Sequence, residues 1–397
     1  MPIDCFNFLF LRSKRKSTVI NSFLQSLTVF ELVLLSLFSV AILIQLFYYW
    51  VVFGRLAFYK FPVVNDLHKP PVSVVIAARN EYYNLQENLP LILEQDYPDF
   101  EVVVVNHAST DESVLLLKEF QTKYTNLRVV QIARDLNFFQ GKKFPLSLGI
   151  KAATNDILLM TDADCKPIGK NWITSMVENY TPDTEIVLGY GPYKEEKGLL
   201  NLLIRYDTFL VALQYFSFAL MGMAYMGVGR NLSYTRTMFF RNKGFTSHYQ
   251  IASGDDDLFI NQAANKRNVK IAIQKDSFSY SIPKQTFSEW IRQKRRHLTT
   301  GKNYKLKFKI LLGTFSFSQF LVYVSGVILL VFNILPLFVV GLFFLRFITQ
   351  SIVNKKTIGK LQEKHLYIFS LVGELFYMLL IPLLALTTVF SKTIKWK

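Results

Sequence analysis

Four long apolar stretches interrupt the pattern of hydrophobic and polar positions along this chain of 397 residues. The first covers about residues 30–53 and ends in Tyr48-Tyr49-Trp50. Residues 310–345 contain no charged side chain, and Pro336 near their midpoint predicts two helices joined by a tight hairpin. The last stretch covers residues 366–390. These lengths and the interfacial aromatic residues predict one amino-terminal and about three carboxy-terminal transmembrane helices.

Between the first two stretches, short runs of β-branched residues alternate with helical periodicity. Strands are expected over residues 72–78, 101–105 and 127–132, and a fourth is expected to begin at residue 157 and to end by presenting Asp162 and Asp164. Helices are expected up to about Gln95, over residues 112–124 and over residues 143–153. A strand, loop and helix repeated in this rhythm implies right-handed crossovers and a largely parallel sheet. The predicted fold class is therefore α/β, with transmembrane helices at both ends.

Polar groups follow three of these strands, at residues 79–81, 106–111 and 162–164. Parallel sheets bind ligands beyond the carboxyl ends of their strands. We therefore expect the three groups to meet in one crevice.

Asp162 and Asp164 follow a buried strand and are two residues apart, so an extended backbone would present both on one face. Mg²⁺ and Mn²⁺ take oxygen ligands, and Mg²⁺ is often held by one or two carboxylates with substrate phosphates and water. The pair therefore predicts a divalent metal site. An isolated Asp-X-Asp could equally be a loop that caps the next helix.

The formal net charge of +16 is concentrated beside the apolar stretches. Residues 285–309 are strongly basic, and four further lysines lie between the third and fourth predicted spans, at positions 355, 356, 360 and 364. The positive-inside rule then puts the middle of the chain in the cytoplasm. The basic residues between Arg12 and Lys16 do not fit this orientation, because they precede the first span and would then lie outside the cytoplasm. Because the charge lacks interleaved base-stacking aromatic residues, it favours an anionic lipid surface over nucleic acid.

Cysteine and histidine usage excludes two further classes. Cys5 and Cys165 are the only cysteines, so there is no disulfide framework or thiolate metal site. The five histidines are scattered without metalloprotease spacing, which excludes zinc hydrolysis.

Seven motifs resemble family 2 glycosyltransferases in order and spacing, over roughly Val72 to Thr300. They are VSVVIAARNE, EVVVVNHASTD, the segment Asn137–Lys143, LLMTDADC, Gly227–Tyr234, Ser253–Leu258, and Gln293-Lys294-Arg295-Arg296-His297, which is similar to QxxRW. The resemblance implies a GT-A type nucleotide-sugar domain and an inverting reaction. It also implies that Asp162 and Asp164 hold Mg²⁺ or Mn²⁺ against the donor's two phosphates.

The resemblance also assigns the remaining candidates. Asp255 falls where the family has its general base, with Asp256 as the alternative, although three adjacent acids also suit a helix amino terminus. The implied donor-binding residues are Ala78, Arg79, Glu81, Asn106, His107, Lys142, Asp162, Gln293 and Arg296. Asn106 and His107 stand where many relatives have acids, one of which contacts the nucleotide base. The resemblance therefore leaves open whether the donor is a UDP-linked or a GDP-linked sugar. His297 replaces the tryptophan of QxxRW, which in the family provides a platform for sugar stacking. The resemblance therefore leaves processive chain extension open.

Two stretches allow alternative interpretations. Gln293 and Arg296 share a helical face with Trp290, and the same basic amphipathic helix could lie on a membrane surface. Residues 199–226 are apolar apart from Arg205 and Asp207, which favours a domain helix over a fifth span.

The expected protein is a multi-pass membrane glycosyltransferase with a cytoplasmic domain. It would transfer a sugar from a nucleotide sugar to a lipid-linked or membrane-proximal glycan acceptor, alone or as an oligomer. The alternative is a catalytically inactive membrane partner or export scaffold. The expected organisation is a basic segment (1–28), a transmembrane helix (29–53), the transferase domain (54–284), a basic interfacial helix (285–309), a carboxy-terminal membrane region of about three helices (310–390) and a tail (391–397).

Overall fold

The computed structural model describes residues 27–62, 69–133 and 141–389. Within these ranges the chain forms two compact units. One contains the described residues up to Tyr48 together with Leu312–Gln350, and the other contains Tyr49–Leu311 and the described residues from Ser351 onward. Most of the predicted basic amino-terminal segment, residues 137–140 of the Asn137–Lys143 motif and the predicted tail lie outside the described residues.

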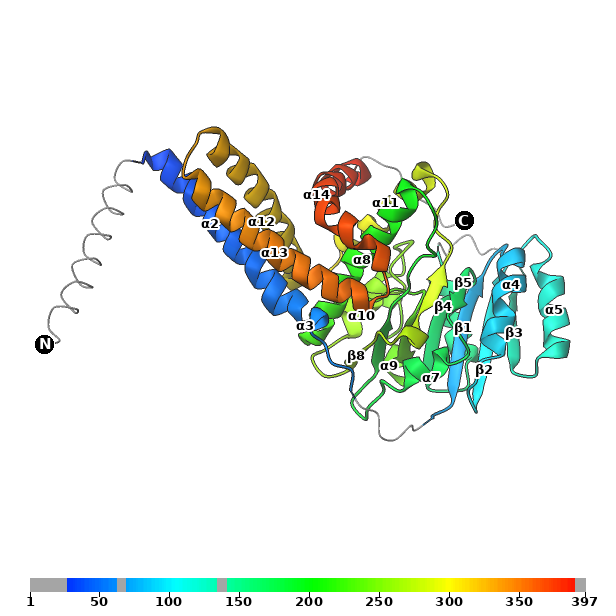
Figure 1. Cartoon of the computed structure of the whole chain (residues 1–397). Helices are drawn as coiled ribbons and strands as arrows, with labels where there is room; N and C mark the ends of the chain where they lie inside the picture. Colours follow the sequence, from blue (N-terminus) through cyan, green and yellow to red (C-terminus); the bar gives the residue numbers. More distant parts are fainter. Residues whose placement is uncertain (1–26, 63–68, 134–140, 390–397) are drawn as a thin grey trace, which may run out of the picture. The chain divides into compact units, whose positions relative to one another are not determined.

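The second unit is built around a seven-stranded sheet with the order β3-β2-β1-β4-β7-β6-β8 (Figure 1). Its strands are β1 (Val72–Ala78), β2 (Phe100–His107), β3 (Leu127–Ile132), β4 (Ile157–Asp162), β6 (Ile186–Gly189), β7 (Leu232–Thr235) and β8 (Val269–Ala272). β1 is parallel to β2 and β4, β2 to β3, and β6 to β8, whereas β7 is antiparallel to β4 and β6. The prediction of a mostly parallel α/β sheet is confirmed.

Helices cover both faces of the parallel strands, which explains why the strand sequences are almost continuously apolar. The helices are α4 (Tyr82–Leu93), α5 (Ser113–Lys123), α6 (Lys143–Ala152) and α7 (Trp172–Val177). Val74 and Ile76 of β1 belong to a core shared with α4, α5 and α7. On the other face α6 packs closely, since a Cβ at Gly149 would lie 2.6 Å from Val75 and 2.9 Å from Val105.

The strand register brings the predicted site segments together at one edge of the sheet. Ala77 pairs with Asp162 and Ala78 pairs with Asn106. One detail of the prediction is wrong: β4 ends at Asp162, and Asp164 lies in the turn before β5 (Cys165–Pro167), which pairs with β9 (Ser279–Ser281). The two carboxylates therefore approach each other across a turn rather than along one strand face.

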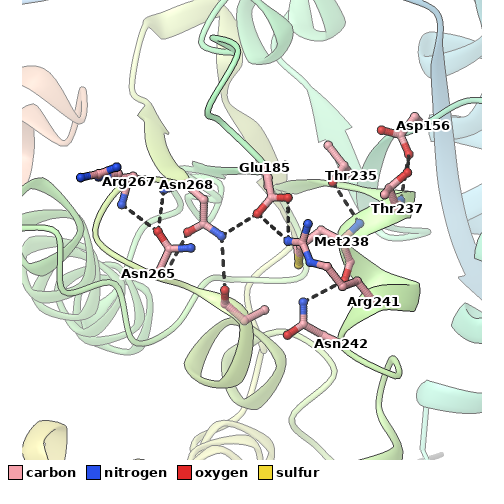
Figure 2. A network of polar contacts seen from close by, with 11 residues as sticks. Asp156, Glu185, Thr235, Thr237, Met238, Arg241, Asn242, Asn265, Arg267 and Asn268 are labelled. Atoms are coloured by element: carbon pink, nitrogen blue, oxygen red, sulfur yellow. Dashed lines mark hydrogen bonds and ion pairs between the residues drawn. The ribbon is translucent and has the colours of Figure 1, made fainter.

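A polar network fixes the opposite edge of the sheet, where β4, β6 and β8 begin (Figure 2). Glu185 accepts hydrogen bonds of 2.6 and 2.8 Å from Arg241 and one of 3.0 Å from Asn268. Asp156 accepts bonds of 2.8 and 2.7 Å from the backbone N–H and hydroxyl of Thr237, at the start of α9 (Arg236–Arg241). This network orders the strand beginnings independently of the candidate site.

The helix α8 (Leu199–Leu220) is a domain helix, as favoured by its charges, and is not among the candidate spans of the described residues. It packs against α14 (Tyr367–Val389), where the Tyr206 ring lies 5.2 Å from the rings of both Phe369 and Tyr377. The Tyr377 hydroxyl also donates a 2.8 Å hydrogen bond to the carbonyl of Leu203. One apolar helix is thus joined directly to the α/β domain.

Two shorter helices complete this unit around the site. They are α10 (Asp257–Ala263) and α11 (Phe287–Gly301), and the 3-10 turns are η2 (Thr246–His248), η3 (Lys275–Ser277) and η4 (Lys364–Leu366). Thr286 begins α11 as its N-cap. Lys294 of α11 is buried and its ammonium lies 2.7 and 2.6 Å from the carboxylate oxygens of Asp207 in α8. This lysine therefore holds two helices together and offers no free charge to a surface.

Four helices are long and apolar enough to cross a membrane, which confirms the predicted one amino-terminal and three carboxy-terminal candidates. The first candidate, Val29–Ala57, consists of α2 (Val29–Phe47), a π-helical turn η1 (Tyr48–Phe53) and α3 (Gly54–Ala57). The others are α12 (Leu306–Val331), α13 (Pro336–Lys360) and residues Lys364–Thr387, which include most of α14.

In the first unit, α2, α12 and the first part of α13 lie side by side around a shared core (Figure 1). Phe38, Val322 and Val339 supply this core from the three helices. Arg346 is buried in the unit and donates a 2.9 Å hydrogen bond to Gln45. The helix α13 also continues beyond its apolar part through Lys355, Lys356 and Lys360, which the sequence analysis placed between two spans, because no glycine or proline interrupts residues 346–358.

Candidate active site

The carboxylates of Asp162 and Asp164 lie at the carboxyl end of β4 together with the thiol of Cys165. One ligand atom of each lies within 4.8 Å of the others. Cys165 is fully buried, and burial followed by the charges of the two aspartates raises the pKa of its thiol. A protonated thiol is a poor metal ligand. The usable donors are therefore carboxylate oxygens, the type that Mg²⁺ and Mn²⁺ prefer.

Lys142 forms an ion pair with the first of these acids. Its ammonium lies 2.6 Å from Asp162, and the two side chains are 24% and 29% exposed. Burial acts to raise the pKa of Asp162, but Lys142, followed by Arg230 and Arg296, outweighs it and leaves the pKa below its ordinary value. Asp162 is therefore held ionised by a cation that water can still reach.

Arg230 is a second cation at this site, and the sequence analysis did not single it out. Its guanidinium lies 4.2 Å from the ring centroid of Tyr193, whose hydroxyl accepts a 3.1 Å hydrogen bond from Gln293. The Nη1 atom of Arg230 is buried without a hydrogen-bond partner among the described residues. Lys142, Arg230 and Arg296 therefore place three positive charges within electrostatic range of Asp162.

The three consecutive acids at residues 255–257 begin α10, and two of them are fully engaged. Asp256 is the N-cap and accepts hydrogen bonds of 2.8 Å from the N–H of Gly229 and 2.7 Å from that of Asp257. Burial, followed by the charges of Asp255 and Asp257, raises the pKa of Asp256 to about 8. The helix-terminus alternative therefore describes Asp256 well.

Asp257 is buried and held by three donors. The hydroxyls of Thr300 and Tyr304 donate to one oxygen, and the N–H of Leu258 donates to the other at 2.7 Å. Burial nevertheless raises the pKa of Asp257. Asp255, by contrast, is half-buried and makes no hydrogen bond or ion pair with the part of the chain that the structure describes.

A single dipeptide connects the two acidic groups. The N–H of Gly229 donates to Asp256, and the carbonyl of Arg230 accepts a 2.9 Å hydrogen bond from the hydroxyl of Thr161, which precedes Asp162. Lys142 is within electrostatic range of Asp255 as well as Asp162, and these attractions raise its pKa against the opposing effect of burial. The structure therefore brings the metal-binding candidates and the base candidates into one neighbourhood.

Lys143 is another residue that the sequence analysis did not assign to the site. It is 1% exposed, and its ammonium donates hydrogen bonds of 2.7, 2.6 and 2.7 Å to the carbonyls of His248, Ile251 and Ser253. These carbonyls belong to the segment that leads into Asp255. Burial lowers the pKa of Lys143 to about 8, against the attraction of the three acids. Lys143 thus fixes the chain just before the acidic group.

The segments after β1 and β2 are joined by hydrogen bonds. The N–H of Asn80 donates to Ser109 at 2.9 Å, and the amide oxygen of Asn80 accepts from the N–H of Thr110 at 2.7 Å. Asp111 accepts a 3.0 Å bond from the N–H of Tyr82. Burial acts to raise the pKa of Asp111, but its hydrogen bonds outweigh it and lower that pKa. Backbone strain at Asn80, with φ of 55°, is offset by these bonds.

The remaining donor-site candidates differ in accessibility. Ala78, Asn106 and His107 are buried, and Asn106 donates a 3.1 Å hydrogen bond to Gln131. Arg79 and Glu81 are half-buried. Burial raises the pKa of Glu81, and among the charges that act on it those of Asp164, Lys142 and Asp162 place it beside the metal candidates.

Comparison with known proteins agrees with this geometry. Residues 73–242 match the family described as Glycosyl transferase family 2. The glycosyltransferase AglE of Haloferax volcanii is 35% identical over 100 residues, which are 25% of this chain and 32% of that protein. A poly-beta-1,6-N-acetyl-D-glucosamine synthase of Staphylococcus epidermidis is 30% identical over 93 residues, 23% of this chain and 21% of that protein. The matched stretch thus spans a third or less of these relatives.

The mannosyltransferase PcManGT of Pyrobaculum calidifontis, solved in complex with GDP-Man and Mn²⁺, has a similar fold. The alignment has a TM-score of 0.54 at 18% identity and covers 87% of this chain and 98% of that one. At this identity the likeness concerns the fold alone. Residues 73–242 thus match the glycosyl transferase family 2 model within a domain of the GT-A fold, which is preceded and followed in sequence by helices long enough to span a membrane.

Proposed function

We propose that this protein is a membrane-bound, inverting glycosyltransferase that moves a sugar from a nucleotide sugar to a lipid-linked or membrane-proximal glycan acceptor. The observation that carries the proposal is the Gly229-Arg230 connection. It joins the segment of Asp162 to the acidic group at residues 255–257 through two hydrogen bonds of 2.9 and 2.8 Å. A transferase needs its donor site and its base in one neighbourhood, because orientation of both reactants supplies much of the rate.

Asp162 and Asp164 would hold a divalent cation, Mg²⁺ or Mn²⁺. Their oxygens converge within 4.8 Å, and the neighbouring thiol stays protonated, so the donor set suits a hard cation. The Mn²⁺ and GDP-Man in the mannosyltransferase PcManGT complex support this assignment. When bound, the cation would neutralise charge on the departing nucleoside diphosphate. Lys142, Arg230 and Arg296 would bind phosphate oxygens beside it.

Asp255 is the best candidate for the general base. Both oxygens of Asp256 accept backbone hydrogen bonds, and Asp257 is held by Thr300 and Tyr304. Asp255 keeps both oxygens available to substrate within the described structure. It would take the proton of the acceptor hydroxyl as that oxygen bonds to the anomeric carbon and the bond to the diphosphate breaks, which inverts the configuration.

The acceptor is proposed to lie at a membrane because the domain carries its own apolar helix. α14 packs against α8 through Tyr206 and Tyr377, inside the unit that contains the site. The positive charge beside the spans favours a cytoplasmic domain, where nucleotide sugars would reach it. The synthase of Staphylococcus epidermidis, a polysaccharide-forming relative by its name, fits a cell-envelope acceptor.

The direct test is hydrolysis and transfer of radiolabelled UDP- and GDP-sugars by the purified full chain, with and without Mn²⁺ or Mg²⁺. We expect metal-dependent turnover that is lost in Asp164→Ala. Asp183→Ala is the matched control, since Asp183 is exposed and lies outside the site. Nuclear magnetic resonance of the first product should show the opposite anomeric configuration to the donor.

Unchanged turnover in Asp164→Ala would remove the metal role from this pair. Absence of any metal-dependent donor binding in the wild type, measured by calorimetry across the donor panel, would favour a catalytically inactive partner instead.

A further inference from the structure

A cavity of about 640 Å³ lies in the same unit as the α/β domain but at a different place from the acidic groups. Its lining includes Phe58, Tyr59 and Phe61 after α3, residues of the last turns of α13, and the segment that follows β8. The volume falls within the range of small-molecule sites. β8 is separated from β4, which carries Asp162, by β7 and β6. The cavity is therefore distinct from the proposed donor site.

Three lysines line this cavity without acidic partners. Lys275, Lys356 and Lys360 form no ion pair with any residue in the described ranges. The ammonium of Lys360 donates a 2.6 Å hydrogen bond to the carbonyl of Tyr59 and lies 5.3 Å from the ring centroid of Phe61. Lys275 and Lys356 are exposed. Because like charges repel, a group of lysines around one cavity is stabilised by a bound anion.

The cavity also lies at the ends of two candidate spans. Ala57 ends the first candidate span and Lys360 ends the third, and both residues line the cavity. Two of its aromatic residues are exposed, Phe58 at 49% and Phe61 at 45%, and Tyr59 is half-buried. The rings of Trp50 and Phe58 are stacked, with centroids 6.3 Å apart. Tryptophan and tyrosine at the end of a span are typical of the boundary between lipid and water, and Trp50 and Tyr59 are of these types.

We propose that this cavity binds the phosphate headgroup of an anionic lipid of the surrounding bilayer. The lysines recognise the phosphate, and the exposed rings of Phe58 and Phe61 contact the apolar part of the same lipid. This function is separate from glycosyl transfer. It depends on the candidate spans lying in a membrane, and it does not depend on the metal or base assignments.

The test uses the full chain in detergent micelles, with phosphatidylglycerol or phosphatidylcholine added and lipid-bound protein measured by native mass spectrometry. The double variant Lys275→Gln/Lys356→Gln removes two cations that make no hydrogen bond in the described structure. We expect its affinity for phosphatidylglycerol to fall about thirtyfold, with no change for phosphatidylcholine. The matched control is Lys118→Gln/Lys151→Gln, which removes two exposed lysines elsewhere in the unit. This control should bind like the wild type.

Three results would overturn the proposal. They are wild-type phosphatidylglycerol binding by the double variant, an equal loss in the control pair, and displacement of the lipid by an equal concentration of inorganic phosphate, which would make the cavity a site for free anions. Thermal unfolding and donor hydrolysis of the double variant should match the wild type. A defect in lipid binding alone therefore separates this proposal from the proposed enzyme activity.

Discussion

The two acidic groups of the α/β domain are held in opposite ways. Asp162 is fixed by one ion pair to Lys142, and both side chains remain about a quarter exposed. Asp256 and Asp257 are fixed by backbone N–H groups and by the hydroxyls of Thr300 and Tyr304. The first arrangement can exchange its cationic partner for a ligand. The second cannot change without breaking several hydrogen bonds at once.

This difference suits the two proposed roles. A donor site must release internal partners when a metal and a diphosphate bind, so an accessible ion pair is an appropriate resting state. A general base must already point at its target, and Asp255 follows a backbone that Lys143 ties down at three carbonyls. We therefore expect substitutions at the first group to affect donor binding and substitutions at the second to affect turnover.

The largest expected effect is that of Asp255→Asn. The variant keeps the shape of the side chain and loses the basic oxygen, so kcat should fall by about 10²–10⁴-fold while donor affinity stays at the wild-type value. Steady-state kinetics of sugar transfer, combined with calorimetric titration of the donor, measure both quantities. Asp164→Ala should instead lose metal-dependent donor binding, and turnover should be lost with it.

Asp256→Asn serves as the comparison for the base assignment. If Asp256→Asn abolishes turnover and Asp255→Asn does not, the base is Asp256 and its engagement by Gly229 and Asp257 must loosen during the reaction. Loss of donor binding in Asp255→Asn would instead show that the two groups do not divide their roles.

A smaller effect is expected for Lys142→Met. Without this cation, burial is opposed only by the more distant Arg230 and Arg296, so the pKa of Asp162 should rise from its lowered value. Metal and donor binding require the ionised carboxylate. They should therefore be lost at a higher pH in the variant than in the wild type as the solution is acidified. At neutral pH the loss of a charged contact should weaken donor binding by about tenfold to a hundredfold.

Calorimetric titrations of donor and Mn²⁺, carried from neutral pH to below 3.8, the ordinary pKa of an aspartate, measure this shift. Lys170→Met, at an exposed lysine in the same unit, is the control. An unchanged pH midpoint in Lys142→Met would contradict the electrostatic role of the ion pair.

The sequence predicted the sheet and its site edge because those features depend on local patterns. Continuous apolar runs ending in polar residues located β1, β2 and β4, and the parallel topology then placed residues 78, 106 and 162 at one edge. The apolar lengths likewise located all four candidate spans. The predicted end of the third span was wrong. The α13 helix continues through its lysine-containing end, because helix propensity decides where a helix ends and hydropathy alone does not show it.

The missed residues share a different property, because their partners are distant in sequence. Lys143 contacts carbonyls about a hundred residues later, and Arg230 lies over Tyr193. Lys294 appeared as part of a basic surface, but it forms a buried ion pair with Asp207. Similarly, the hydrogen bond from Gly229 to Asp256 joins residues that only the folded chain brings near, whereas the bond from Asp257 that caps α10 is local. No local pattern distinguishes these side chains from ordinary exposed charges.

The smallest expected effect on turnover is that of Lys143→Met, which acts through the segment before Asp255 and touches no reacting group. It leaves three carbonyls without their donor, so the free energy of unfolding should fall by about 1–3 kcal/mol and kcat by less than tenfold, with KM unchanged. Lys143→Arg should restore part of both.

The stability difference should also depend on pH. Because burial lowers the folded-state pKa of Lys143 to about 8, below the ordinary 10.5, the unfolded wild type binds more protons than the folded wild type between these values. As the pH rises from 8 to 10.5, the free energy of unfolding of the wild type should therefore increase relative to that of Lys143→Met. Thermal unfolding at several pH values measures this difference, with Lys151→Met at an exposed lysine as the control. Equal stability of Lys143→Met and the control would show that the three hydrogen bonds do not order the segment of the base.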